Sequence, residues 1–234
     1  SMYISVYDLN REQIEKLYSI GEKKDKISIK THDNSKYTIN FLNDKLVDVS
    51  IDSNKLENIN KFYNYLLNNG YQINSVCINV ENIDYLSMNL SIYEEMSKET
   101  NLTFDYGCGG PHPDLEEFKG LLASLNWYRN LIDAANLSPT EKVMFAFDIM
   151  KTFVYNESSV SKSDSRYPHR IIETGNIVCV GYSNMLKQIL KDMDNIKVGE
   201  LYVDCYDSND KHLGGHERNV VEIDDSKYDI HGIY

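Results

Sequence analysis

The segment Glu173-Thr174-Gly175-Asn176-Ile177-Val178-Cys179-Val180-Gly181-Tyr182-Ser183 decides how the second half of this chain folds. Apolar residues then recur at helical spacing, at Leu186, Ile189, Leu190 and Met193. The pattern predicts a helix that begins at Cys179. Unpaired amide N–H groups and the positive end of the helix dipole favour a thiolate at such a position, so Cys179 is a candidate nucleophile. The alternative is that Cys179 is a small apolar residue packed in the core.

Two strands are predicted beyond this helix. Residues 201–206 alternate apolar and polar side chains, and a second strand begins at Gly215-His216 and continues to Val221. His216 at the start of that strand is a candidate general base, because a reactive cysteine precedes it on a helix start. A histidine alone on a strand is otherwise a structural or surface residue.

This order of elements resembles the transglutaminase-like superfamily, which shares its core with papain-type proteases. The resemblance covers about residues 138–234 and does not extend to the first hundred. It is carried by Cys179-Val180-Gly181-Tyr182-Ser183, by Gly215-His216 with Asn219-Val220-Val221, by Tyr228, and by the helix start Ser138-Pro139-Thr140-Glu141-Lys142. It implies an α+β fold in which a helix bearing the cysteine packs on an antiparallel sheet bearing the histidine.

The resemblance also implies an activity. The cysteine attacks an amide carbonyl of a peptide or protein, an amine leaves, and water or another amine resolves the acyl-thioester, as in a transglutaminase, deamidase or protease. The backbone N–H of Cys179 is the natural first donor to the oxyanion, and Asn176 and Tyr167 are candidates for the second. No cofactor or metal is implied.

The third catalytic group is not evident from the sequence. Family members orient the imidazole with an Asp or Asn on the next strand. If Asp225-Ser226 forms a two-residue turn, Asp229 pairs with Glu222, roughly 20 Å along the strand from His216. Asp229 is the candidate acid only if the register shifts. Otherwise we expect either that the third catalytic residue lies beyond the end of this sequence or that a different group orients the imidazole.

The first part of the chain has the pattern of a small α+β domain over residues 1–105. A helix is predicted near residues 10–21, three antiparallel strands at 26–31, 36–42 and 46–51, a helix from Leu56 to Gly70, a strand at 72–80 and a helix at 83–97. Gly and Pro cluster in residues 106–113, where we expect the domain boundary before a core domain over 106–234.

Helices and a loop are expected upstream of the cysteine. Asp114 is an expected helix cap, and Ser138 to Glu141 has the pattern of a capping box. The helix that follows is expected to direct Val143, Phe147, Met150 and Val154 inward. A polar surface loop is expected over residues 156–165.

Composition limits the classes of partner that we expect for this chain. The net charge of −12 argues against a nucleic-acid partner, because a surface that binds nucleic acid needs clustered Lys and Arg. The four cysteines, Cys77, Cys108, Cys179 and Cys205, form no C-x-x-C pair, so reduced thiols and no metal site are expected. No apolar run predicts a membrane span, and we expect a soluble protein, cytoplasmic by default, or secreted if a leader precedes this sequence. The oligomeric state is left open.

Two functions from different classes fit these patterns. The first is a cysteine-dependent acyltransferase or hydrolase. The second is a binding or scaffolding module that keeps the fold and lacks turnover, which the missing orienting acid favours.

Overall fold

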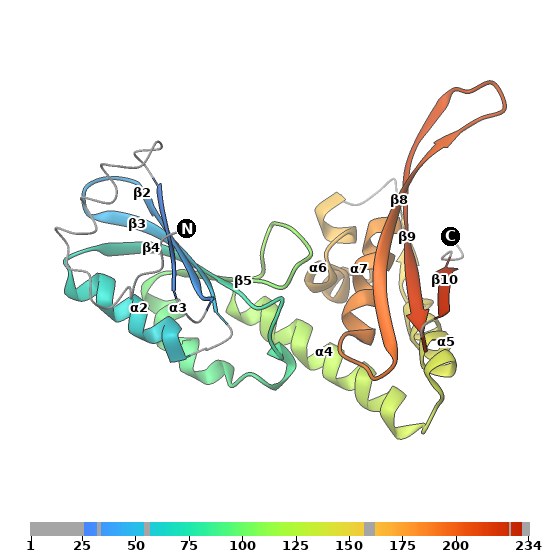
Figure 1. Ribbon diagram of the computed structural model, residues 1–234, viewed down its shortest axis with the longest axis horizontal. Coiled ribbons are helices and arrows are strands. Elements are labelled where there is room, and N and C mark those ends of the chain that lie inside the picture. Colours follow the sequence, from blue (N-terminus) through green and yellow to red (C-terminus); the bar gives the residue numbers. More distant parts are fainter. Residues whose placement is uncertain (1–25, 32–33, 54–56, 157–161, 225, 231–234) are drawn as a thin grey trace. The chain divides into compact units, whose positions relative to one another are not determined.

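The computed structural model describes residues 26–31, 34–53, 57–156, 162–224 and 226–230. The chain divides into two compact units, Ser1–Glu116 and Glu117–Tyr234. Both helices and strands are present, so the fold is α+β at the coarse level, as predicted (Figure 1). The helix expected near residues 10–21 lies outside the described residues.

The first unit contains a five-stranded sheet in the order β1-β2-β3-β4-β5 (Figure 1). The strands β1 (Lys26–Lys30), β2 (Lys36–Phe41) and β3 (Leu46–Asp52) are antiparallel, which confirms the predicted meander. Every second side chain is buried in them. The strands β4 (Gln72–Asn79) and β5 (Asn101–Asp105) then add in parallel. The sequence pattern did not predict β5.

Helical segments connect the parallel strands. The helix α2 (Glu57–Asn68) is followed by Gly70 at φ 84°, the left-handed position that ends the predicted helix. The single helix predicted over 83–97 is wrong, because this segment forms η2 (Tyr85–Ser87), η3 (Leu90–Tyr93) and α3 (Glu94–Glu99). The Asn89 side chain accepts a hydrogen bond from the Ser91 N–H and starts a new short helix there.

The Gly- and Pro-rich segment 106–113 lies within the first unit, whereas we expected the boundary at its start. The Phe104 N–H donates to the Pro113 carbonyl at 3.0 Å, and the Gly107 N–H donates to Asp105 Oδ1 at 2.9 Å. These bonds fold the segment back onto β5, which explains why the two units divide after it.

The second unit begins in α4 (Leu115–Ala134) and continues with α5 (Pro139–Met150). The capping box before α5 is confirmed, since Ser138 Oγ accepts from the Glu141 N–H at 3.3 Å and Glu141 Oε1 accepts from the Ser138 N–H at 3.2 Å. The prediction that Val154 lies on the inner face of this helix is wrong. The helix ends at Met150, and Val154 is 62% exposed in β6 (Val154–Tyr155).

The next segment is more structured than predicted. It contains η4 (Lys162–Ser165), α6 (Pro168–Thr174) and β7 (Asn176–Ile177), which pairs in parallel with β6. Residues 157–161 lie outside the described part, and Ser165, expected in a surface loop, is fully buried.

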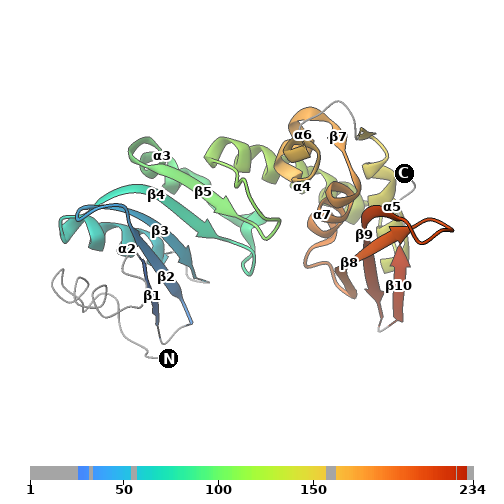
Figure 2. The ribbon, with the colours of Figure 1, turned by 90° about the horizontal axis from the view of Figure 1, so that it is seen from above.

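The helix α7 (Cys179–Leu190) begins at the predicted residue. The strands β8 (Ile196–Tyr206), β9 (His212–Ile223) and β10 (Ser226–Ile230) follow and form an antiparallel sheet in the order β10-β9-β8. The two predicted strands are therefore present and longer than expected. Figure 2 shows α7 alongside this sheet. The helix contacts β8 and β9, and most of its residues from Gly181 to Leu190 are buried.

Candidate functional site

Cys179 is the first residue of α7 and is half-buried. Its N-cap residue, Val178, has an extended backbone and offers no side-chain hydrogen bond to the helix. The first intrahelical bond joins the Tyr182 N–H to the Val178 carbonyl at 2.9 Å. The N–H groups of the first turn therefore have no intrahelical acceptor and are oriented to meet negative charge.

The end of η4 packs against this first turn. The Ser165 carbonyl accepts from the Val178 N–H at 3.1 Å. A Cβ atom placed on Gly181 would lie 2.2 Å from the same carbonyl oxygen. The glycine in the Cys179–Ser183 motif is thus required by close packing, and this packing holds the start of α7.

Tyr182 fixes the other side of the helix start. Its ring stacks on Tyr155 of β6, with centroids 6.3 Å apart and planes at 27°. Burial raises the pKa of the Tyr182 hydroxyl, so it stays neutral at physiological pH. Both β6 and η4 therefore contribute to the placement of Cys179.

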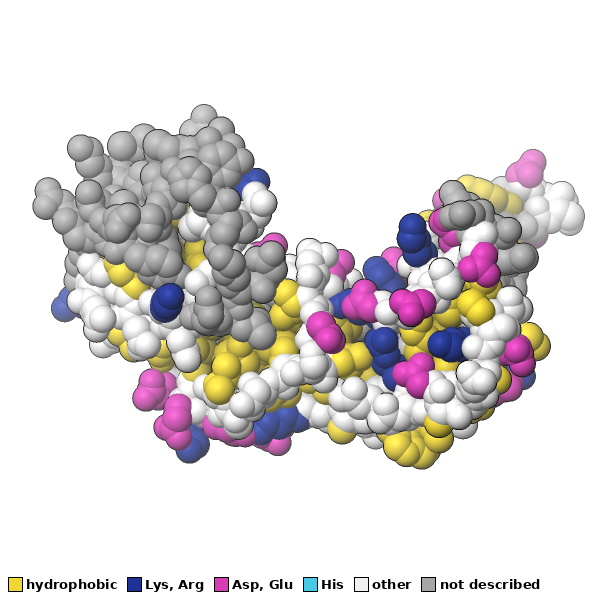
Figure 3. All heavy atoms as spheres, turned by 60° about the horizontal axis from the view of Figure 1, so that its bottom comes forward, with side chains coloured by type: hydrophobic (Ala, Val, Ile, Leu, Met, Phe, Trp, Pro, Cys, Tyr) yellow, Lys and Arg dark blue, Asp and Glu magenta, His cyan; other side chains and the backbone are white. Residues whose placement is uncertain are grey.

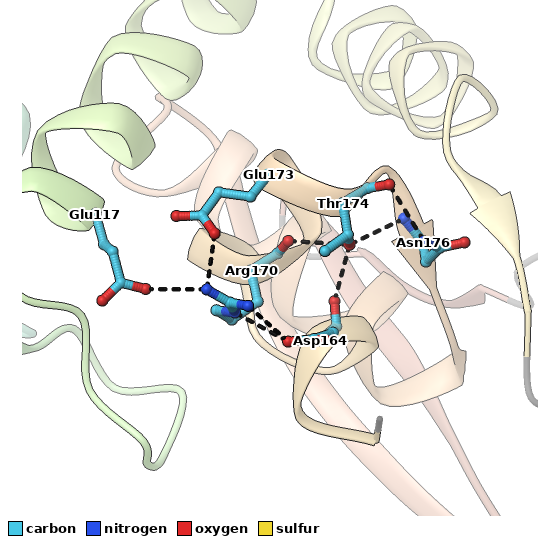
Figure 4. Close-up of polar contacts among 6 residues, drawn as sticks. All are labelled: Glu117, Asp164, Arg170, Glu173, Thr174 and Asn176. Atoms are coloured by element: carbon cyan, nitrogen blue, oxygen red, sulfur yellow. Dashed lines mark hydrogen bonds and ion pairs between the residues drawn. The ribbon is translucent and has the colours of Figure 1, made fainter. Parts of the chain in front are cut away.

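The two candidate oxyanion donors lie in the segment before α7. The Asn176 side chain donates to the Thr174 carbonyl at 3.2 Å, and the Asn176 backbone N–H donates to Thr174 Oγ1 at 3.3 Å (Figure 4). Tyr167 is the N-cap residue of α6, and its ring stacks on His169 at a centroid distance of 6.1 Å. These contacts do not involve Cys179, and both oxyanion roles stay predictions.

One face of the three-stranded sheet is directed at α7. Asn219 Nδ2 donates to the Ser183 carbonyl at 3.2 Å and to the Gly199 carbonyl at 3.3 Å. Lys187 of α7 forms an ion pair with Glu200 of β8 at 3.4 Å. Since Glu200 and Asn219 are cross-strand partners, both strands turn this set of side chains toward the helix.

Glu217 belongs to the same face, two residues before Asn219. Burial raises the pKa of the Glu217 carboxyl, and the neighbouring Glu200 raises it further, whereas Lys187 and Arg166 oppose the shift. The sequence pattern did not predict a carboxyl group on this face, under the electrostatic influence of Lys187 of α7. The alternation of Glu217, Asn219, Val221 and Ile223 is the sequence signal that could have indicated it.

His216 pairs with Val203, in a register that runs without interruption from Ile196↔Ile223 to Cys205↔Gly214. Side chains alternate along a strand, and His216 is three residues from Asn219. The alternation therefore assigns His216 to the face of the sheet opposite the one that meets α7. In this register the alternation does not assign His216 to the side of β9 that meets α7, and its pairing with Cys179 stays a prediction.

The hairpin between β9 and β10 corrects the predicted register. Ile223 pairs with Ser226, so the turn does not use Asp225-Ser226 as its two central residues. Asp224 has φ 48°, a left-handed conformation that Asp tolerates in tight turns. Asp229 consequently pairs with Val220 rather than Glu222. It remains four residues along the strand from His216, about 13 Å.

A polar network surrounds Arg170 of α6 (Figure 4). Its guanidinium group contacts Asp164 of η4, Glu173 of α6 and Glu117 of α4. The Arg170–Glu173 pair has i,i+3 helical spacing, but Glu117 is 53 residues away in sequence and no local pattern predicts that contact.

Other features of the described residues add no site next to Cys179. A cavity of about 550 Å³ lies at the opposite end of α7 and is lined by residues including Asp192, Asp194 and Asp224. In the described ranges no cluster of three His, Cys, Asp or Glu side chains could bind a metal ion. None of the helices that are described has the length and apolarity to cross a membrane.

No protein-family model matches this chain, and no curated protein sequence matches it.

Proposed function

We propose that the second unit catalyses acyl transfer or hydrolysis at amide bonds of a peptide or protein, with the Cys179 thiolate as nucleophile. The observation that carries the proposal is the position of Cys179 at the first residue of α7, next to amide groups that the side chain of the N-cap residue does not cap. In this proposal α7 and the antiparallel strands β8, β9 and β10 form a papain/transglutaminase-like core.

The proposed reaction has two steps. The Cys179 sulfur bonds to the amide carbonyl carbon, and the carbonyl electron pair moves to the oxygen, which the Cys179 backbone N–H stabilises. The C–N bond then breaks, and the leaving amine takes a proton. Water or a second amine attacks the thioester and restores the thiol.

His216 is the proposed carrier of that proton. The role requires its ring to approach Cys179, whereas the register of β9 directs Glu217 and Asn219 to α7. The enzyme proposal therefore requires β9 to rotate near its start, where Gly214 has φ 126° and Gly215 adjoins His216. Asp229 keeps its role as orienting acid only if β10 also shifts.

A second candidate is a binding or scaffolding module that has the same core and no turnover. The register of the sheet favours it specifically, because His216 and Cys179 are assigned to different sides of β9. In this candidate Cys179 is a packing residue at the helix start.

Thiol reactivity tests the first proposal. We expect iodoacetamide near pH 7 to label Cys179 at least about ten times faster than Cys205, a half-buried cysteine on β8, as a thiolate-stabilising site implies. Cys77 gives a slow reference, since burial raises the pKa of its thiol. Peptide mapping by mass spectrometry measures each rate. Equal labelling rates for Cys179 and Cys205 would contradict the proposed role of Cys179 as nucleophile.

Two histidine variants on β9 then separate the candidates. His216→Ala should slow the labelling of Cys179 and alter its pH profile if His216 is the base. His212→Ala is the matched control, because His212 is exposed on the same strand and pairs with Asp204. If both variants label Cys179 like the parent protein, and no carboxamide peptide releases ammonia, the binding module is the better account.

A further inference from the structure

We propose that Arg170 is a positioning residue for Cys179, because its guanidinium group fixes the segment that accepts the hydrogen bond of the α7 N-cap residue. The inference rests on the proposed role of Cys179 as nucleophile. It adds a residue that neither the sequence pattern nor the proposed reaction identifies.

The guanidinium group of Arg170 joins three carboxylates from three elements (Figure 4). Arg170 Nε donates to Asp164 Oδ1 at 3.0 Å, and Nη2 lies 2.9 Å from the same oxygen. Nη1 donates to Glu173 Oε2 at 2.7 Å and lies 3.5 Å from Glu117 Oε2. Removing the cation would leave these three acidic groups close together without their shared counter-charge.

Asp164 connects this cluster to the start of α7. The Asp164 carbonyl accepts from Thr174 Oγ1 at 3.2 Å, which ties η4 to the end of α6. The next residue, Ser165, is buried, and its carbonyl accepts from the Val178 N–H at 3.1 Å. Gly181 packs against the same carbonyl oxygen. Through Asp164, Arg170 thus helps to hold the Ser165 carbonyl, which meets the start of α7 at the Val178 N–H and at Gly181.

A shift of η4 would therefore be transmitted to the first turn of α7. The Val178 N–H would lose its acceptor, and the amide groups beside Cys179 would change direction. Partly exposed ion pairs add little to stability by themselves, so the effect of Arg170 should appear at Cys179 more than in the melting temperature.

The test compares Arg170→Gln with two controls in the full chain. Arg170→Lys keeps the positive charge but loses the planar fork that contacts Asp164 through two nitrogens. Lys151→Gln breaks an exposed ion pair with Asp148 in the same unit. Circular dichroism and thermal melting establish that each variant is folded, and the readout is the rate of Cys179 alkylation by iodoacetamide from pH 5 to 10.

We expect Arg170→Gln to slow the labelling of Cys179 at pH 7 about 3- to 10-fold and to move the midpoint of the pH profile upward by roughly 0.5 to 1 unit, since one unit is a tenfold change in thiolate fraction. Arg170→Lys should lie between this variant and the parent protein, and Lys151→Gln should match the parent. A purely structural role would lower the melting temperature and leave the profile in place.

Failure of the proposed function and failure of the positioning role of Arg170 give different results. If Cys179 of the parent protein reacts no faster than Cys205, the proposed function fails and this inference with it. If Cys179 is fast in the parent and Arg170→Gln has the same profile, the positioning role alone fails. Should Arg170→Gln not fold, Asp164→Asn replaces it, because it weakens the same contact and keeps the pairs with Glu117 and Glu173. An unchanged profile in Asp164→Asn overturns the inference.

Discussion

The carboxyl group of Glu217 lies between opposing electrostatic influences. Burial and Glu200 raise its pKa, whereas Lys187 and Arg166 lower it, and burial is the largest contribution. Because the folded protein holds the Glu217 proton more tightly than the unfolded chain does, ionised Glu217 destabilises the fold. Its stabilising contribution is present below the unfolded pKa and is lost as the pH rises through the folded pKa.

The raised pKa of Glu217 leads to a prediction for the variant Glu217→Gln. We expect it to raise the melting temperature at pH 7, because a neutral side chain of the same shape avoids the charge. The difference from the parent protein should vanish below about pH 4, where Glu217 itself is protonated. Melting curves between pH 3 and 8 measure this. Glu222→Gln, on the same strand, serves as the control.

The opposite result at pH 7 would also be informative. If Glu217→Gln melts at a lower temperature than the parent, the attraction to Lys187 and Arg166 outweighs burial. Glu217 would then be a structural ion-pair partner of α7, and the direction assigned to its pKa would be wrong.

At the scale of elements, Gly181 in α7 reverses the usual ranking of Gly and Ala. Alanine normally stabilises a helix by up to about 1 kcal/mol relative to glycine. At Gly181 the added Cβ would lie 2.2 Å from the Ser165 carbonyl oxygen, which belongs to the backbone and cannot rotate away. We expect Gly181→Ala to destabilise the protein by about 1–3 kcal/mol, as overpacking does.

A second glycine supplies the matched control in urea denaturation. Gly120 lies in α4, and nothing is within 4 Å of the position where its Cβ would be. Gly120→Ala should therefore leave stability unchanged or raise it by up to about 1 kcal/mol. If Gly181→Ala is as stable as Gly120→Ala, the Ser165 carbonyl of η4 does not pack closely against Gly181 of α7.

Local patterns predicted the elements that local chemistry controls. The antiparallel strands β1 to β3, the end of α2 near Gly70, the capping box before α5 and the start of α7 follow from turn residues and periodicity. The elements missed were short. Both β5 and α6 have seven residues or fewer, too few for a clear period.

The candidate site was predicted less completely than the fold. Cys179 at the helix start follows from the apolar spacing after it. The face of β9 depends on strand register, and a shift of one residue exchanges His216 for Glu217 on the side toward α7. Contacts such as Arg170 with Glu117 join distant residues and leave no sequence pattern.

At the scale of the whole molecule, each unit has its own apolar core. Phe62 is fully buried in the first unit beside Tyr37, with ring centroids 4.4 Å apart. Leu186 is fully buried in α7 of the second unit. Basic and acidic side chains are interspersed on the face shown in Figure 3, so the net charge of −12 does not form one acidic patch there.

Two cores of this kind predict that damage to one unit leaves the other intact. Phe62→Ala should cost the first unit about 3–5 kcal/mol by opening a cavity, and Leu186→Ala about 2–5 kcal/mol in the second. Hydrogen exchange followed by mass spectrometry should then show faster exchange in β2 to β4 for Phe62→Ala, with the rate of Cys179 labelling unchanged. Leu186→Ala should change that labelling rate, because Leu186 lies in the helix that Cys179 begins. If Phe62→Ala alters Cys179 as much as Leu186→Ala does, the two units unfold as one cooperative body, and their separate cores do not make them independent.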